Sequence, residues 1–288
     1  MPQKSFYLDS YSRYLDILWK QSLTPDYFID HDKYSIATIS GDETDLHWFV
    51  FKNEATDFTT ELINSINAFS LYMKRLNAWY VVFSNCRDSE EQEALLIELI
   101  YPIVFICINK PYSIRSQFIY ATTHLLHLSN LKKSLYWKDK LITDDKYINF
   151  RTLEEVGNGW TGFCCFCKTL NTINNEEFKK NTLDFRNKSH HAIPPELEFG
   201  LSPTVWRTET KNGEVSYNIG GNAPLKINKL INLLRCQQQA FLDTFSSYWK
   251  LMEEQIECWK RPNNTEPPNE SINSTCQNND NSQESLPT

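Results

Sequence analysis

Apolar residues recur at steps of three and four positions along most of the chain, which is the spacing of one face of an α-helix. The pattern is clearest where Leu62, Ile63, Ile66 and Phe69 follow one another. Acidic first turns, Asn residues and prolines mark where helices begin and end. We therefore predict a mainly α fold with helices over residues 57–80, 89–110, 112–131, 152–170, 175–193 and 226–259, with a kink at Pro102 and the last helix the longest.

Two other stretches are typical of strands rather than helices. The first is residues 33–53, where a turn at residues 41–45 precedes the aromatic and β-branched run of residues 46–51. The second is residues 204–220, where an Asn-Gly pair, Asn212 and Gly213, lies between two alternating arms and is a strong signal for a hairpin turn. We expect two β-hairpins added to a helical body.

The composition changes after Arg261, where Asn, Ser, Gln, Glu and Pro replace apolar residues. Such a segment cannot bury enough surface to offset the loss of chain entropy, so we predict a disordered tail over residues 261–288. We divide the rest of the chain into an N-terminal extension of helix and hairpin, residues 1–55, and a helical domain, residues 56–260.

Composition and charge restrict the possible functions. The net charge is −7 at pH 7, which argues against a protein that coats nucleic acid, so any contact with RNA must be local. The first residues contain no apolar run of the kind that a signal peptide needs, and the strongest apolar stretch, residues 94–108, is shorter than a bilayer span. We expect a cytoplasmic protein without a membrane segment, whose eight cysteines are free thiols.

One segment combines residue types that can do chemistry. Arg186 and His191 are separated by four residues, Asn187 follows the arginine directly, and a proline pair, Pro194 and Pro195, closes the segment. This spacing resembles the R-x(4–6)-H signature of HEPN-domain proteins, and residues 184–195 look closest to a HEPN branch whose motif runs straight into two prolines. The specific content of the resemblance is one hexapeptide, and its helix pattern extends over about residues 57–259.

The resemblance implies a HEPN-like helical bundle. Many HEPN proteins are metal-independent endoribonucleases that act as dimers, whereas others bind without catalysis. Membership would therefore imply RNA as the partner, a homodimer with a composite site, and no cofactor or metal. A toxin or defence effector with an antitoxin or nucleotidyltransferase partner would be one setting for such an enzyme.

The residue types themselves are suited to RNA cleavage. A histidine titrates near neutral pH and can take the proton of a ribose 2′-hydroxyl, and a guanidinium stabilises the charge that builds on the phosphate oxygens. We assign the phosphate to Arg186, acid or base catalysis to His191 at the family spacing, and the positioning of the imidazole or phosphate to Asn187.

Two further residues of the segment, Lys188 and His190, are assigned to substrate binding. In an unbroken helix His190, and not His191, would share a face with Arg186. We expect the prolines to unwind the helix end, and for that reason prefer His191. Lys179, Lys180 and Arg207 would add local positive charge.

Other candidate sites have simpler explanations. Cys164 and Cys167 have the spacing of half a zinc site, but no second pair of ligands has the complementary spacing, so core packing explains them better. His124 and His127 share a helix face without a partner carboxylate and are expected to pack. A helix end that carries cations at the negative pole of its dipole is the structural alternative for Arg186 and His191.

Three functions follow from these observations. The first is a metal-independent endoribonuclease that cleaves RNA by attack of the 2′-hydroxyl. The second is a non-catalytic HEPN module that binds RNA, a nucleotide or a partner protein. The third is an interaction scaffold whose tail recruits another molecule.

Overall fold

The structure of the chain is a computed structural model that describes residues 4–21, 28–36, 41, 45–134, 136–138, 141, 148–210 and 212–261. It is mainly helical, as the apolar spacing predicts. Apart from Arg261, the tail predicted over residues 261–288 lies outside the described residues. The α-helices are α1 (Lys4–Lys20), α2 (Leu46–Asn85), α3 (Ser89–Leu95), α4 (Tyr101–Lys133), α5 (Phe150–Gly157), α6 (Phe163–Leu170), α7 (Glu176–Asn181), α8 (Phe185–His191) and α9 (Ile227–Trp259). A 3-10 turn (Asp32–Tyr34), a π-helical turn (Leu96–Ile100) and the strands β1 (Val205–Glu209) and β2 (Val215–Ile219) complete the described elements.

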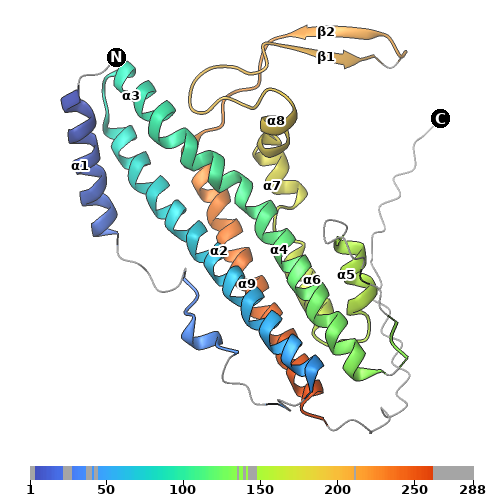
Figure 1. Cartoon of the computed structure of the whole chain (residues 1–288). Coiled ribbons are helices and arrows are strands. Elements are labelled where there is room, and N and C mark those ends of the chain that lie inside the picture. The colour runs from blue at the N-terminus through green and yellow to red at the C-terminus, as the bar shows by residue number, and fades with distance from the viewer. Residues whose placement is uncertain are drawn as a thin grey trace.

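Three long helices, α2, α4 and α9, run side by side and form the core (Figure 1). Phe69, Phe118 and Phe241 supply one fully buried ring from each helix. Phe69 and Phe241 meet edge to face, with ring centroids 5.0 Å apart. Burial of one such side chain stabilises the fold by about 1.5–3 kcal/mol, so this shared interior is the main source of stability. Among the described elements the longest single α-helix is α2, at 40 residues, so the prediction that residues 226–259 form the longest helix is wrong.

The hairpin predicted over residues 33–53 is wrong for its second arm, because residues 46–51 are the first turns of α2. Asp45 caps the helix: its carboxylate accepts hydrogen bonds from the backbone N–H groups of His47 (2.9 Å) and Trp48 (3.4 Å). Trp48 and Phe51 are both buried, whereas a strand would place them on opposite faces. Residues 37–40 and 42–44 of the predicted hairpin lie outside the described part of the chain.

The helices predicted over residues 89–110 and 112–131 form one continuous helical run, so the end predicted at Pro111 is wrong. Pro111 lies inside α4 and is buried. It removes one N–H donor, and packing of α4 against α2 and α9 compensates for that loss. Pro102, where the sequence predicted a kink, lies in the first turn of α4, directly after the π-helical turn.

The same helical run, residues 89–133, is the part of the described chain that is long and apolar enough to cross a membrane by length and composition. Of its most apolar stretch, 39% is buried in the protein. The run packs along α2 and α9 in the manner of a bundle helix (Figure 1).

The helix predicted over residues 152–170 is two helices, α5 and α6. The chain leaves the helical conformation after Gly157, and Gly159 has a φ of +91°, which a residue with a side chain rarely adopts. Asn130 of α4 holds this corner in place, since its amide nitrogen donates to the carbonyl of Val156 (2.7 Å) and its amide oxygen accepts from the indole N–H of Trp160 (2.8 Å). These buried hydrogen bonds fix α5 and α6 on one end of α4.

The helix predicted from Asn175 is likewise two helices, α7 and α8. Asn175 begins α7 as predicted, with its side-chain oxygen accepting from the N–H of Phe178 (2.9 Å). Leu183 and Asp184, with φ values of +53° and +54°, then separate the two helices. The chain leaves α8 at Ala192, before the proline pair, so the prediction that the prolines end this helical region is confirmed.

The second predicted hairpin is confirmed. Strands β1 and β2 pair antiparallel, with Val205 opposite Ile219 and Glu209 opposite Val215, and Gly213 in the turn has a φ of +80°. The resulting ribbon extends away from the helices at the end of the molecule where α8 lies (Figure 1).

Candidate functional site

Helix α8 carries the predicted site residues and lies against α4 (Figure 1). Its first residue, Phe185, is fully buried and attaches the helix to the bundle. The Phe185 ring lies 6.2 Å from the ring of Tyr101 and 6.4 Å from that of Phe105, measured between centroids. Because the next residues of α8 turn outward from this anchor, the motif sits on the surface beside the first half of α4.

Arg186 is half-buried and stacks on Tyr112 of α4, with its Cζ atom 3.5 Å from the centroid of the ring. Within the part of the chain that the structure describes, the guanidinium has no carboxylate partner and donates no hydrogen bond. The stack covers one face of the guanidinium and leaves its N–H groups, which lie at the edge, available to an acceptor. The arrangement suits an incoming anion.

His190 lies on the same face of α8 as Arg186, four residues along, and contacts the neighbouring turn of α4. Its Nε2 atom is 3.3 Å from Oδ1 of Asn109. Asn109 donates its amide nitrogen to the carbonyl of Phe105 (2.7 Å), so its oxygen is the atom left to accept from His190. The proton of the neutral imidazole is therefore assigned to Nε2, and Nδ1 is left as the basic nitrogen.

His191 lies outside this face and is exposed, with its ring centroid 6.3 Å from that of His190. The helix end that the prolines were expected to unwind stays helical through His191, so that expectation is wrong. The neighbouring turn N-terminal to α8 supplies the partner for Asn187, whose amide nitrogen donates to Oδ2 of Asp184 (3.2 Å). The structure thus brings Arg186 and His190 together on one face and places His191 next to them.

Positive charge near α8 is partly compensated. Lys188 is half-buried, Lys180 is exposed, and Lys179 forms an ion pair with Glu176 in α7. Arg207, the more distant predicted contributor, is exposed on β1 of the ribbon. The cationic surface is therefore small and local, in agreement with the acidic total charge.

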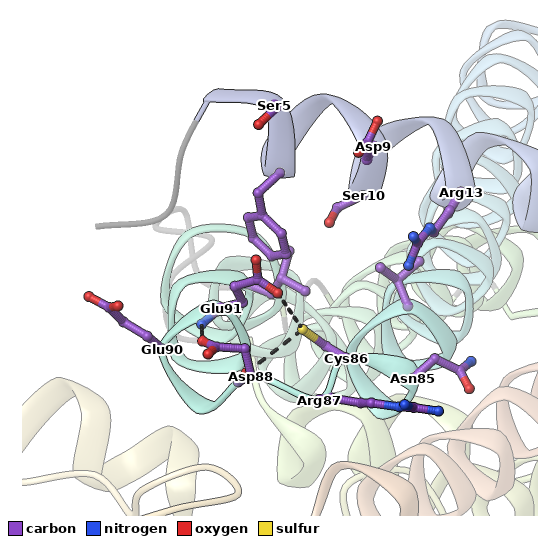
Figure 2. A pocket seen from close by; sticks show the side chains of 13 residues that line it. Ser5, Asp9, Ser10, Arg13, Asn85, Cys86, Arg87, Asp88, Glu90 and Glu91 are labelled. Atoms are coloured by element: carbon purple, nitrogen blue, oxygen red, sulfur yellow. Dashed lines mark hydrogen bonds between the residues drawn. The ribbon is translucent and has the colours of Figure 1, made fainter.

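A separate hollow of about 550 Å³ lies between α1 and the junction of α2 and α3 (Figure 2). Arg13 and Arg87 line it together with acidic residues that include Glu91. The thiol of Cys86 donates to Oε2 of Glu91 (3.3 Å), and burial, followed by this hydrogen bond, raises the pKa of Cys86. A thiol held protonated is a poor nucleophile, and neither a histidine nor any residue of α8 lines this hollow.

The other candidates of the sequence lie elsewhere. Cys164 and Cys167 are half-buried on α6, and among the described residues there is no group of three metal-ligating side chains. His127 is buried and its Nδ1 accepts a hydrogen bond from the indole N–H of Trp137 (3.1 Å), which is a packing role. His124 is half-buried beside the rings of Phe58 and Tyr120.

No protein-family model, curated protein or solved structure matches the chain. The function is therefore inferred from the geometry of α8. Sequence reasoning missed Tyr112 and Asn109, which orient Arg186 and His190, because both lie far from the motif along the chain and belong to a helix whose pattern is that of ordinary core packing.

Proposed function

We propose that α8 binds a phosphodiester of RNA and that the protein is a metal-independent endoribonuclease of the HEPN type. The observation that supports this most is the state of Arg186, a half-buried arginine fixed by a stacked ring and without an ion pair or hydrogen bond to its side chain among the described residues. A guanidinium in that state matches two nonbridging phosphate oxygens with its planar fork. The spacing of the motif and the mainly helical fold agree with the proposal.

The chemistry requires one imidazole as base and one as acid. The base takes the proton of the ribose 2′-hydroxyl, the oxygen attacks phosphorus, and the bond from phosphorus to the 5′-oxygen breaks. The acid returns a proton to the leaving 5′-oxygen, so the products are a 2′,3′-cyclic phosphate and a 5′-hydroxyl. Arg186 stabilises the charge on the phosphate oxygens as the bonds change.

His190 and His191 are the two imidazoles that one chain offers for these roles. His190 shares the face of Arg186 and has Nδ1 free to take a proton, which favours it as the base. His191 occupies the position that the family spacing favours, and its ring lies beside that of His190. A twofold dimer would add a second set of the same groups, as the resemblance implies.

The alternative is a module that binds RNA, a nucleotide or a partner protein without cleaving it. The Arg186 geometry supports anion binding under either hypothesis. The two hypotheses differ in whether a bond breaks, so cleavage and binding must be measured on the same samples.

The test uses the full chain and end-labelled RNA in the presence of a chelator, with the variants Arg186→Ala, His190→Ala and His191→Ala. Arg151→Ala is the matched control. Arg151 is an exposed arginine of α5 that forms an ion pair with Glu155, and α5 contacts the end of α4 that lies away from α8. An enzyme loses cleavage in the α8 variants and keeps it in the control. A binding module loses affinity in Arg186→Ala without cleavage at any stage, and unchanged binding and cleavage in that variant would reject both hypotheses.

A further inference from the structure

The ribbon formed by β1 and β2 exposes apolar side chains to solvent. None of its residues whose burial is described is buried. Val215, Tyr217 and Ile219 of β2 are 46%, 68% and 89% exposed. Two strands alone are marginally stable in water, and exposed apolar residues on a projecting ribbon mark a contact surface.

The register of the ribbon shows which backbone groups remain open. Thr210 donates to the carbonyl of Glu214 (2.7 Å), and Gly220 donates to that of Thr204 (2.9 Å), so these residues form hydrogen-bonded pairs at the two ends. Bonded and non-bonded pairs alternate along an antiparallel ladder. Residues 215, 217 and 219 therefore stand in non-bonded pairs and direct their N–H and C=O groups to the outer edge of β2, where no other described strand pairs with them.

The two edges of the ribbon differ in charge. On β1 the corresponding outward residues include Arg207 and Glu209, and charged side chains of this kind discourage pairing with another strand. On β2 they are Val215, Tyr217 and Ile219, without any charge. The edge of β2 therefore combines an open ladder with an apolar surface.

We propose that β2 pairs antiparallel with β2 of a second copy of this chain, around a twofold axis at Tyr217. In this register Tyr217 lies opposite Tyr217 of the other copy, and Val215 lies opposite Ile219. These are aromatic and β-branched cross-strand pairs, which stabilise a sheet, and all of them use backbone groups that are open in the single chain. The result is a four-stranded sheet in the order β1, β2, β2, β1.

The charge of the ribbon favours a second copy of the chain, and not RNA, as the partner of the β2 edge. The ribbon sequence contains Arg207 and Lys211 against Glu209 and Glu214, so it has no excess of positive charge to attract phosphate. Two neutral β2 strands meet without like charges opposite each other. The contact is smaller than the ~800 Å² per partner of a standard interface, so we expect a dimer that dissociates on dilution.

The first test is sedimentation velocity of the full chain over a range of concentrations, without RNA. The wild type is expected to shift with concentration toward twice the 33.8 kDa of one chain. Tyr217→Lys places two positive charges opposite each other and is expected to remain at one chain mass. The matched control is Val205→Lys, at an exposed apolar position of β1 outside the proposed contact, which is expected to behave as the wild type. A wild type that stays monomeric, or a dimer that tolerates Tyr217→Lys, overturns the proposal.

The second test is disulfide cross-linking, which does not depend on a lysine variant that could disturb the ribbon itself. Cysteines at the twofold position of a bonded pair have Cα atoms about 5.5 Å apart, within the range of a disulfide. Under mild oxidation Tyr217→Cys is therefore expected to form a covalent dimer beyond the background of the native thiols. Asn218→Cys, on the opposite face and paired with position 216 of the other copy, is expected to stay at that background.

Equal cross-linking of both cysteine variants would show that the register is wrong. If Tyr217→Lys instead weakens RNA binding without changing the mass, the edge serves RNA and not a second copy. These results are independent of whether α8 cleaves RNA, because neither mass nor cross-linking depends on catalysis.

Discussion

The attachment of α8 to the bundle depends on Phe185. The variant Phe185→Ala measures how much free energy this side chain contributes to the attachment. The side chain is fully buried between the rings of Tyr101 and Phe105. Removal of a buried phenylalanine side chain costs about 3–5 kcal/mol, and the lower figure applies here because a short peripheral helix can shift to close part of the cavity. A loss of about 3 kcal/mol corresponds to roughly a hundredfold change in the equilibrium between attached and detached α8.

Hydrogen exchange at single amides is the assay that follows this change. The amide of Lys188 donates to the carbonyl of Asp184, just before α8 (3.0 Å), and the amide of Ala192 donates to the carbonyl of Lys188, within α8 (2.8 Å). Both amides therefore report on whether the helix is formed. In Phe185→Ala we expect their exchange to accelerate by about two orders of magnitude, since local opening controls exchange in such a segment. Phe185→Leu, which keeps most of the volume, is expected to cost less than about 1.5 kcal/mol. Unchanged exchange in the alanine variant would refute the anchoring role.

Three further predictions follow from other contacts. Asn130→Ala leaves the carbonyl of Val156 and the indole of Trp160 without their partner, and is expected to lower the free energy of unfolding in urea by about 3 kcal/mol. Burial raises the pKa of Cys107 from 9.0 to about 12, so the folded state holds this proton more tightly. The stability that the protonated Cys107 contributes is present below pH 9 and is lost as the pH rises toward 12. The urea midpoint of unfolding should therefore fall less over that pH range in Cys107→Ala than in the wild type. Tyr112→Ala removes a cation–π contact worth about 0.5–1 kcal/mol and should weaken RNA binding roughly two- to fivefold in an anisotropy titration, whereas Tyr112→Phe, which keeps the ring face, should bind as the wild type.

The sequence predicted the mainly helical class, the second hairpin and the start of α7 because these depend on local signals. Apolar spacing, an Asn-Gly turn and a capping Asn act within a few residues. It failed at residues 46–51, where a short run of aromatic and β-branched residues fits a strand as well as a helix. The helix is favoured there because residues further along α2 are buried and because Asp45 caps its first turn.

Two other failures have tertiary causes. Pro111 was expected to end a helix, but packing on two sides carries α4 through it. Leu183 and Asp184 separate α7 from α8 and have positive φ values. Neither residue is a glycine, so the sequence did not indicate a break at this point. The residues of α8 could be named from the motif alone, but their orientation could not, because it is set by Tyr112 and Asn109 on a different helix.

In the proposed function, Arg186 and the adjacent imidazoles act on a phosphodiester through the neighbouring 2′-hydroxyl. The most direct test of this claim compares an RNA that the wild type cuts with the same strand carrying one 2′-deoxy nucleotide at the cut position, in a chelator. We predict that the wild type leaves a 2′,3′-cyclic phosphate on the first strand and does not cut the second at that position, and that Arg186→Ala cuts neither. Equal cutting of both strands by the wild type, or cutting by Arg186→Ala at the wild-type rate, would contradict the claim.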